Sequence, residues 1–209
     1  PDNFTALKSQ QFRWAKGSIQ TAIKLLPRVL RSPLPRFVKL QSIAHFGGHL
    51  IHAGMLGLGL LALPLLLVDA TLFTPLGWFV AGVPILLATF GPSLLYLCSQ
   101  VSLLGRTGWR RVTLLPALLT VGFGICLSNT RAILEAIFGV KSGFVRTPKA
   151  GERRAKHYRL PASLTTLLEI ALALYAAVTL VLALVYGRGS IGPFLLVYLA
   201  GFTAVGFGS

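Results

Sequence analysis

The sequence contains little charge, and acidic residues are especially few. Charged residues make up 12% of the 209 positions, about half the fraction usual in soluble domains, whereas hydrophobic residues make up 54%. No two of the acids form a pair in the sequence. They are Asp2, Asp69, Glu135, Glu152 and Glu169. Because divalent metals such as Mg bind clustered oxygen ligands, these acids offer no such metal site, and none of them can be assigned as a general base.

Cysteine is equally scarce. Cys98 and Cys126 lie in apolar surroundings without a C-x-x-C spacing, which predicts two small buried hydrophobic side chains. The first 20 residues lack a secretory signal pattern. The chain begins with Pro1 and stops at Ser209 within an apolar stretch, so we expect both ends to be cuts within a longer protein.

Basic residues outnumber acidic ones by 20 to 5, which gives a net charge of +15. Such a charge could bind nucleic acid, but the lysines and arginines lie between and beside long apolar runs. That placement is typical of cytoplasmic loops and lipid headgroup contacts. We therefore expect membrane lipids as partners and no nucleic acid.

The apolar runs predict an all-α membrane protein, because several reach the roughly 18 to 20 residues that cross a bilayer. About four transmembrane helices are expected, the last of them truncated, together with two interfacial amphipathic helices. The expected spans are residues 42–68, 78–104, 162–187 and 191–209.

Residues 112–138 are long enough to cross, yet basic clusters flank them on both sides. A single crossing would place one cluster outside, against the positive-inside rule. The second half is also amphipathic, with Arg131 and Glu135 on one face and Ile133 and Ile137 on the other. We interpret this segment as interfacial or re-entrant, which leaves Arg188 as the one basic residue of 20 outside the cytoplasm.

Residues 1–40 predict an amphipathic interfacial helix, broken or bent near Pro27. One face carries apolar residues and the rest of the surface carries polar ones. The apolar face holds Phe12, Ile19, Ile23, Leu26 and Leu30, and the residues placed elsewhere are Arg13, Lys16, Gln20, Lys24 and Arg31. The chain then divides into the interfacial region 1–40, a transmembrane pair 41–104, an interfacial helix and loop 105–161, and a second transmembrane pair 162–209.

The predicted first helix contains candidate phosphate- and sugar-binding residues in the string Gln10-Gln11-Phe12-Arg13-Trp14. An arginine at a membrane surface can bind phosphate oxygens with its forked donors, and a tryptophan offers a flat face to a sugar ring. Alternatively, the two side chains anchor an interfacial helix in the headgroup region.

This string matches the Q-x-x-R-W motif of family 2 glycosyltransferases such as cellulose and hyaluronan synthases. The wider text PDNFTALKSQQFRWAKGSIQTAIKLLP resembles bacterial relatives of the plant glucomannan and mannan synthase-like enzymes. The resemblance implies that Arg13 contacts the donor pyrophosphate, Trp14 stacks on the acceptor sugar, and Gln10 helps to shape the acceptor site.

A second string, Gly143 to Lys149 (GFVRTPK), resembles the F-x-V-T-x-K gating loop of cellulose synthases, with Arg146 in place of the usual valine. The resemblance implies that Thr147 and Lys149 approach the nucleotide phosphates and that Phe144 anchors the loop. Such a lid would exclude water from the donor site. The alternative is a solvated basic loop on anionic lipid.

The resemblance covers only the C-terminal membrane part of such an enzyme. It implies transfer of a hexose from a UDP- or GDP-linked donor to a β-glycan or lipid acceptor, at the cytoplasmic side of the bacterial inner membrane, and export through the membrane if the enzyme is processive. The D-x-D site for Mg or Mn and the general base would lie upstream of Pro1. Alone, this chain is expected to be inactive.

Two other functions fit parts of the sequence. The chain could be a non-catalytic transporter segment or scaffold, or a haem- or metal-binding subunit using His45, His49 and His52, which share a helical face. These histidines could also line a saccharide path. We further expect Glu169 to turn into the bundle and to be paired or protonated. The glycines at 54, 57, 59, 122 and 124 are expected to permit close helix packing.

Overall fold

The computed structural model describes residues 4–68, 93–141 and 164–208, and these ranges are helical without a strand. The chain is therefore an all-α membrane protein, as predicted. Residues 93–104 are helical as well. The other elements are α1 (Phe4–Arg31), α2 (Arg36–Gly47), η1 (Gly48–Leu50), α3 (Ile51–Leu67), η3 (Gly105–Leu114), α5 (Leu115–Gly124), α6 (Cys126–Ile137), α7 (Leu164–Val185), η5 (Gly189–Ile191) and α8 (Gly192–Phe207).

Three helical segments of the described ranges are long and apolar enough to cross a membrane: Arg36–Leu67, Leu164–Val185 and Gly189–Phe207. They coincide with three of the four predicted spans. A fourth candidate is the pair Ser93–Gly124 and Cys126–Ile137, which is bent by 47° and could be a broken span or a re-entrant loop. The first half of the predicted span 78–104 lies outside the described residues.

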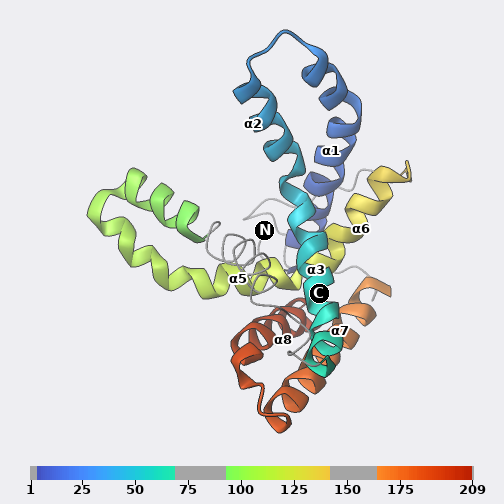
Figure 1. Cartoon of the computed structure of the whole chain (residues 1–209), viewed down its shortest axis with the longest axis vertical. Coiled ribbons are helices and arrows are strands. Elements are labelled where there is room, and N and C mark those ends of the chain that lie inside the picture. The colour runs from blue at the N-terminus through green and yellow to red at the C-terminus, as the bar shows by residue number, and fades with distance from the viewer. Residues whose placement is uncertain (1–3, 69–92, 142–163, 209) are drawn as a thin grey trace, which may run out of the picture.

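Within the described ranges, the helices form three hairpins that diverge from a common centre (Figure 1). Helices α1 and α2 make the first hairpin. Residues 93–104 make the second with η3 and α5, which return the chain toward the centre. Helices α7 and α8 make the third, and α3 runs from the first hairpin to the third. The first and third hairpins therefore mark opposite ends of the segment Arg36–Leu67.

Helix α1 runs through Pro27 to Arg31, so the break expected near Pro27 does not occur. A proline removes only one backbone hydrogen bond from a helix, and the last turn of α1 closes on Ser32. The Ser32 N–H and hydroxyl both donate to the carbonyl of Val29, at 3.2 and 2.6 Å.

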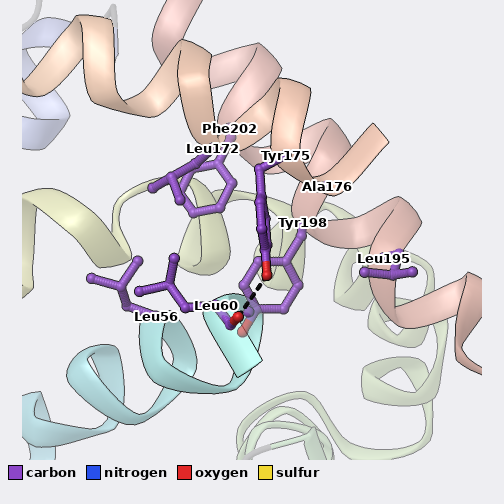
Figure 2. A pocket seen from close by; sticks show the side chains of 9 residues that line it. Leu56, Leu60, Leu172, Tyr175, Ala176, Leu195, Tyr198 and Phe202 are labelled. Carbon is purple, nitrogen blue, oxygen red and sulfur yellow. Dashed lines mark hydrogen bonds between the residues drawn. The ribbon is translucent and has the colours of Figure 1, made fainter. Parts of the chain in front are cut away.

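Helix α3 contains Pro64, which leaves the carbonyl of Leu60 without its usual donor four residues later. The hydroxyl of Tyr175 in α7 donates to this carbonyl at 2.6 Å (Figure 2). A polar side chain of α7 thus satisfies a backbone group that the proline orphans, as a bilayer interior requires.

Two further contacts attach α3 to the α7–α8 hairpin. The hydroxyl of Tyr198 in α8 donates to the carbonyl of Met55, and Gly59 makes room for the ring, because a Cβ there would lie 2.4 Å from Tyr198 Cε1. Arg188, between α7 and α8, donates to the carbonyl of Leu66 and, at 2.9 Å, to that of Val68. Arg188 therefore caps the end of α3 that lies away from α1 and α2.

Replacing Tyr175 by phenylalanine is expected to destabilise the protein by about 1 kcal/mol, the net contribution of one such hydrogen bond. In a Pro64→Ala background the loss should fall toward zero, because the N–H of residue 64 again serves the Leu60 carbonyl. Denaturant titration of the four proteins of this double-mutant cycle in detergent gives the coupling energy. The exposed Tyr186, changed to phenylalanine, is the matched control, and equal losses with and without Pro64 would contradict this account.

The glycine and cysteine predictions are partly wrong. Gly59 and Gly124 do pack closely against neighbouring helices, but a Cβ at Gly54 or Gly57 would meet nothing within 4 Å. Cys126 is buried as expected, whereas Cys98 is exposed. Composition places both cysteines among apolar neighbours, but only the helix orientation decides which side chain faces the protein.

Candidate functional site

The Q-x-x-R-W motif lies in the first half of α1 (Phe4–Arg31). Consecutive helical residues differ by about 100° around the axis, so Gln10, Arg13 and Trp14 fall within one sector of the helix. Trp14 is 54% exposed. The Arg13 guanidinium is half-buried and donates to the Ser9 hydroxyl, one turn earlier, at 2.9 Å. The motif therefore exposes the Trp14 ring on the surface of the helix, next to an arginine side chain that is held against α1 by its hydrogen bond to Ser9.

The opposite sector of α1 packs against the bundle. Ala15 and Ile19 are buried there, and Ile19 joins Ile133 and Ala136 of α6 in one apolar cluster. Farther along the predicted apolar face, Ile23 is 56% exposed. Only the first part of that face is covered by protein.

Lys16 is buried in this packing sector, which corrects the prediction that it lies elsewhere with the polar residues. It follows Phe12 by four residues, so the two share a helical stripe. Its ammonium group lies 2.7 Å from Oε2 of Glu135 in α6. A buried lysine needs such a partner, because an unpaired charge is costly to remove from water.

Glu169 in α7 is fully buried and lies 2.6 Å from the ammonium group of Lys8 in α1. The expectation that Glu169 turns into the bundle and is paired is thus confirmed, and its partner is identified. Glu135 and Glu169 are the two acids within the described ranges, and each forms an ion pair with a lysine of α1.

Phe12 lies beside the two cations that bind Glu135. Its ring centroid is 5.9 Å from the Lys16 ammonium and 5.9 Å from the Arg131 guanidinium carbon, within the range of cation–π attraction. Arg131 also donates to Oε1 of Glu135 at 2.9 Å and to the Thr165 hydroxyl at 3.0 Å. Helices α1, α6 and the first two turns of α7 are therefore joined by one seam of mostly polar residues, which we call the polar seam and define as Lys8, Phe12, Lys16, Arg131, Glu135, Thr165 and Glu169.

Sequence reasoning missed Lys8, and it assigned Lys16 to the wrong face. The available signal was the four-residue spacing of Lys8, Phe12 and Lys16, which aligns the two lysines with an apolar residue expected to face the bundle. Arg131 and Glu135 were correctly placed on one face of their helix, and that face contacts α1.

The predicted gating residues Phe144, Thr147 and Lys149 lie outside the described residues. The helix that follows them, α7, begins at Leu164. Thr165 and Glu169, in its first two turns, contact Arg131 and Lys8. The start of α7 therefore lies beside the helix that carries the Q-x-x-R-W motif.

The three histidines follow one another along α2, η1 and α3. The rings of His49 and His52 are stacked with centroids 6.2 Å apart. Within residues 4–68, 93–141 and 164–208, no group of three His, Cys, Asp or Glu side chains could hold a metal ion. The Mg or Mn that the resemblance implies stays an expectation for a domain upstream of this chain.

The long apolar helices and the helical fold define an integral membrane protein of the all-α class. No protein-family profile, curated protein or solved structure matches the chain.

Proposed function

We propose that this chain is the membrane part of an inverting family 2 glycosyltransferase, which transfers a hexose from a UDP- or GDP-linked donor to a β-glycan or lipid acceptor. The observation that carries the proposal is the presentation of the Q-x-x-R-W motif. Trp14 is exposed on one sector of α1, while the opposite sector is attached to the bundle by two largely buried ion pairs.

In this function the residues of α1 bind and orient the donor and the acceptor, and a domain upstream of this chain would supply the general base and hold the metal. The Arg13 guanidinium donates hydrogen bonds to the donor diphosphate and stabilises the charge that develops as the sugar–phosphate bond breaks. Trp14 stacks on the acceptor sugar, and Gln10 contributes a polar edge to the acceptor site. Phe144, Thr147 and Lys149 would close over the nucleotide.

The position of α7 supports a shared site for the two motifs. Helix α7 is the first described helix after Phe144, Thr147 and Lys149, and its first turns contact α1. Arg188 lies at the far end of α3, away from α1. This arrangement is compatible with a cytoplasmic motif side and a bacterial inner-membrane location.

The test is an assay of the full-length protein that contains this chain, in nanodiscs, with radiolabelled UDP- and GDP-hexoses. Incorporation of label into a polymer or lipid fraction from one donor is expected. If no donor is used in the presence of Mg or Mn, and if Arg13→Ala and Trp14→Ala leave cellular glycan synthesis intact, the scaffold or transporter alternative is favoured instead.

Replacing Trp14 by alanine in that protein is expected to lower the rate of transfer about tenfold, the loss of one aromatic stacking contact. Trp109, which is 59% exposed, provides a matched control, because Trp109→Ala removes an equally exposed indole from another element. Comparable losses in both variants would indicate a general role of interfacial tryptophans, and the acceptor assignment would be wrong.

A further inference from the structure

Two ion pairs bracket the Q-x-x-R-W motif on α1. Lys8 lies just before Gln10 and pairs with Glu169 of α7, and Lys16 lies just after Trp14 and pairs with Glu135 of α6. The two lysines are eight residues apart, which is about 12 Å along the helix and about 80° around it. Attachment at two such points, to two different helices, fixes both the rotation and the axial position of the motif.

Acidic residues are scarce in this chain, so the partner that each one binds is informative. The whole sequence has 20 basic residues and five acids. Both acids of the described ranges form ion pairs with lysines of α1. The pairs are also largely shielded from solvent: the side chains of Lys8 and Glu169 are 11% and 0% exposed, and those of Lys16 and Glu135 are 7% and 15% exposed. The exposed Arg131–Glu135 contact within α6 belongs to the class that contributes little.

Stability alone does not account for buried ion pairs, because well-packed apolar residues of similar volume often stabilise a fold as well or better. Register is a better-supported use of buried charge. Ala15 and Ile19 of α1 are buried as well, and Ile19 packs against Ile133 and Ala136 of α6 in an apolar cluster. Such contacts distinguish weakly between neighbouring registers, whereas each lysine must meet one particular carboxylate.

We propose that Lys8–Glu169 and Lys16–Glu135 are positioning pairs that set the rotation and register of the motif helix, and hence the direction in which Arg13 and Trp14 point. The inference rests on the proposed glycosyl-transfer function, and it assigns the four residues no contact with the substrate. A displacement of about 1 Å at a reacting centre can reduce a rate strongly. The pairs therefore influence turnover indirectly, by fixing where Arg13 and Trp14 lie.

The first experiment measures kcat and donor KM of the full-length protein in nanodiscs with the hexose donor that it uses. Lys8→Met and Glu169→Gln are each expected to lower kcat about tenfold. The charge exchange Lys8→Glu with Glu169→Lys is expected to restore at least half of the lost activity. Lys24→Met, an exposed lysine of the same helix, should leave kcat unchanged.

An apolar double variant separates register from stability. Lys8→Met combined with Glu169→Leu should unfold at the same denaturant concentration as the wild type or a higher one, yet keep the low kcat of the single variants. If this folded variant has the kcat of the wild type, or if the charge exchange folds but restores nothing, the positioning role is wrong. Folded single variants with unchanged kcat would overturn it equally.

A second readout does not depend on catalysis. In a background in which Trp78, Trp109 and any tryptophan outside this sequence are replaced by phenylalanine, Trp14 is the remaining tryptophan, and its emission and acrylamide quenching report its environment. Lys8→Met should shift both, and the charge exchange should return them toward the starting values. If the wild type transfers no sugar from any donor, the proposed function fails, while this measurement still decides whether the pairs orient Trp14. Unchanged emission and quenching in the folded Lys8→Met protein would overturn the inference.

Discussion

Replacing Arg13 by alanine in the full-length protein is expected to lower kcat/KM for sugar transfer about 100- to 1,000-fold, the usual cost of removing one preorganised donor from a developing charge. The proposed contact is with the donor diphosphate, whose charge rises as the sugar leaves. The Arg13 guanidinium is half-buried and held by Ser9, so little reorganisation is needed when the diphosphate binds. Steady-state assays with the labelled donor give the effect.

Arg13→Lys should recover only part of this loss, because an ammonium keeps the charge but not the planar fork of donors. Arg28→Ala is the matched control, since it removes an exposed arginine from the last turn of the same helix. If Arg28→Ala lowers kcat/KM as much as Arg13→Ala, the arginines act through lipid headgroups, and the diphosphate contact is not supported.

The transmembrane segments could be predicted closely from the sequence because the length of an apolar run is a local property. The expected spans 42–68, 162–187 and 191–209 overlap the observed helices over most of their length. The structure of residues 112–138 was harder to predict. The structure divides them at Ile125 into α5 and α6, and whether the bent pair crosses the bilayer stays a prediction.

The seam could not be predicted, because its contacts join residues far apart in the sequence. Lys8 and Glu169 are separated by 161 positions, and Lys16 and Glu135 by 119. Hydropathy assigns every lysine to a polar face, and nothing near Lys16 in the sequence indicates a carboxylate that would neutralise it. Glu169 was easier to interpret, because an acid within an apolar span is costly unless it has a partner.

Replacing Gly124 by valine is expected to destabilise the protein by about 3 kcal/mol or more, since overpacking against backbone cannot be relieved by a rotamer change. A Cβ at this position would lie 2.4 Å from the Gly201 carbonyl oxygen and 2.5 Å from Val205 Cγ2. A Cβ at Gly201 would in turn lie 2.5 Å from the Thr120 carbonyl oxygen. The two glycines therefore let the backbones of α5 and α8 touch, and any side chain at either position forces the helices apart.

Gly122→Val is the control that isolates this contact. Gly122 lies in the same helix, so valine has much the same effect on helix propensity, but a Cβ there would meet only Met55 Cε, at 3.9 Å. Denaturant titration in detergent should therefore show a large loss for Gly124→Val and a small one for Gly122→Val. Helix α8 also packs against α7, which carries Glu169, and Gly206 of α8 faces the Glu169 Cβ. Separation of α5 from α8 should accordingly lower transfer activity as well. Equal losses of stability in Gly124→Val and Gly122→Val would mean that helix propensity, and not the backbone contact, sets the requirement for glycine.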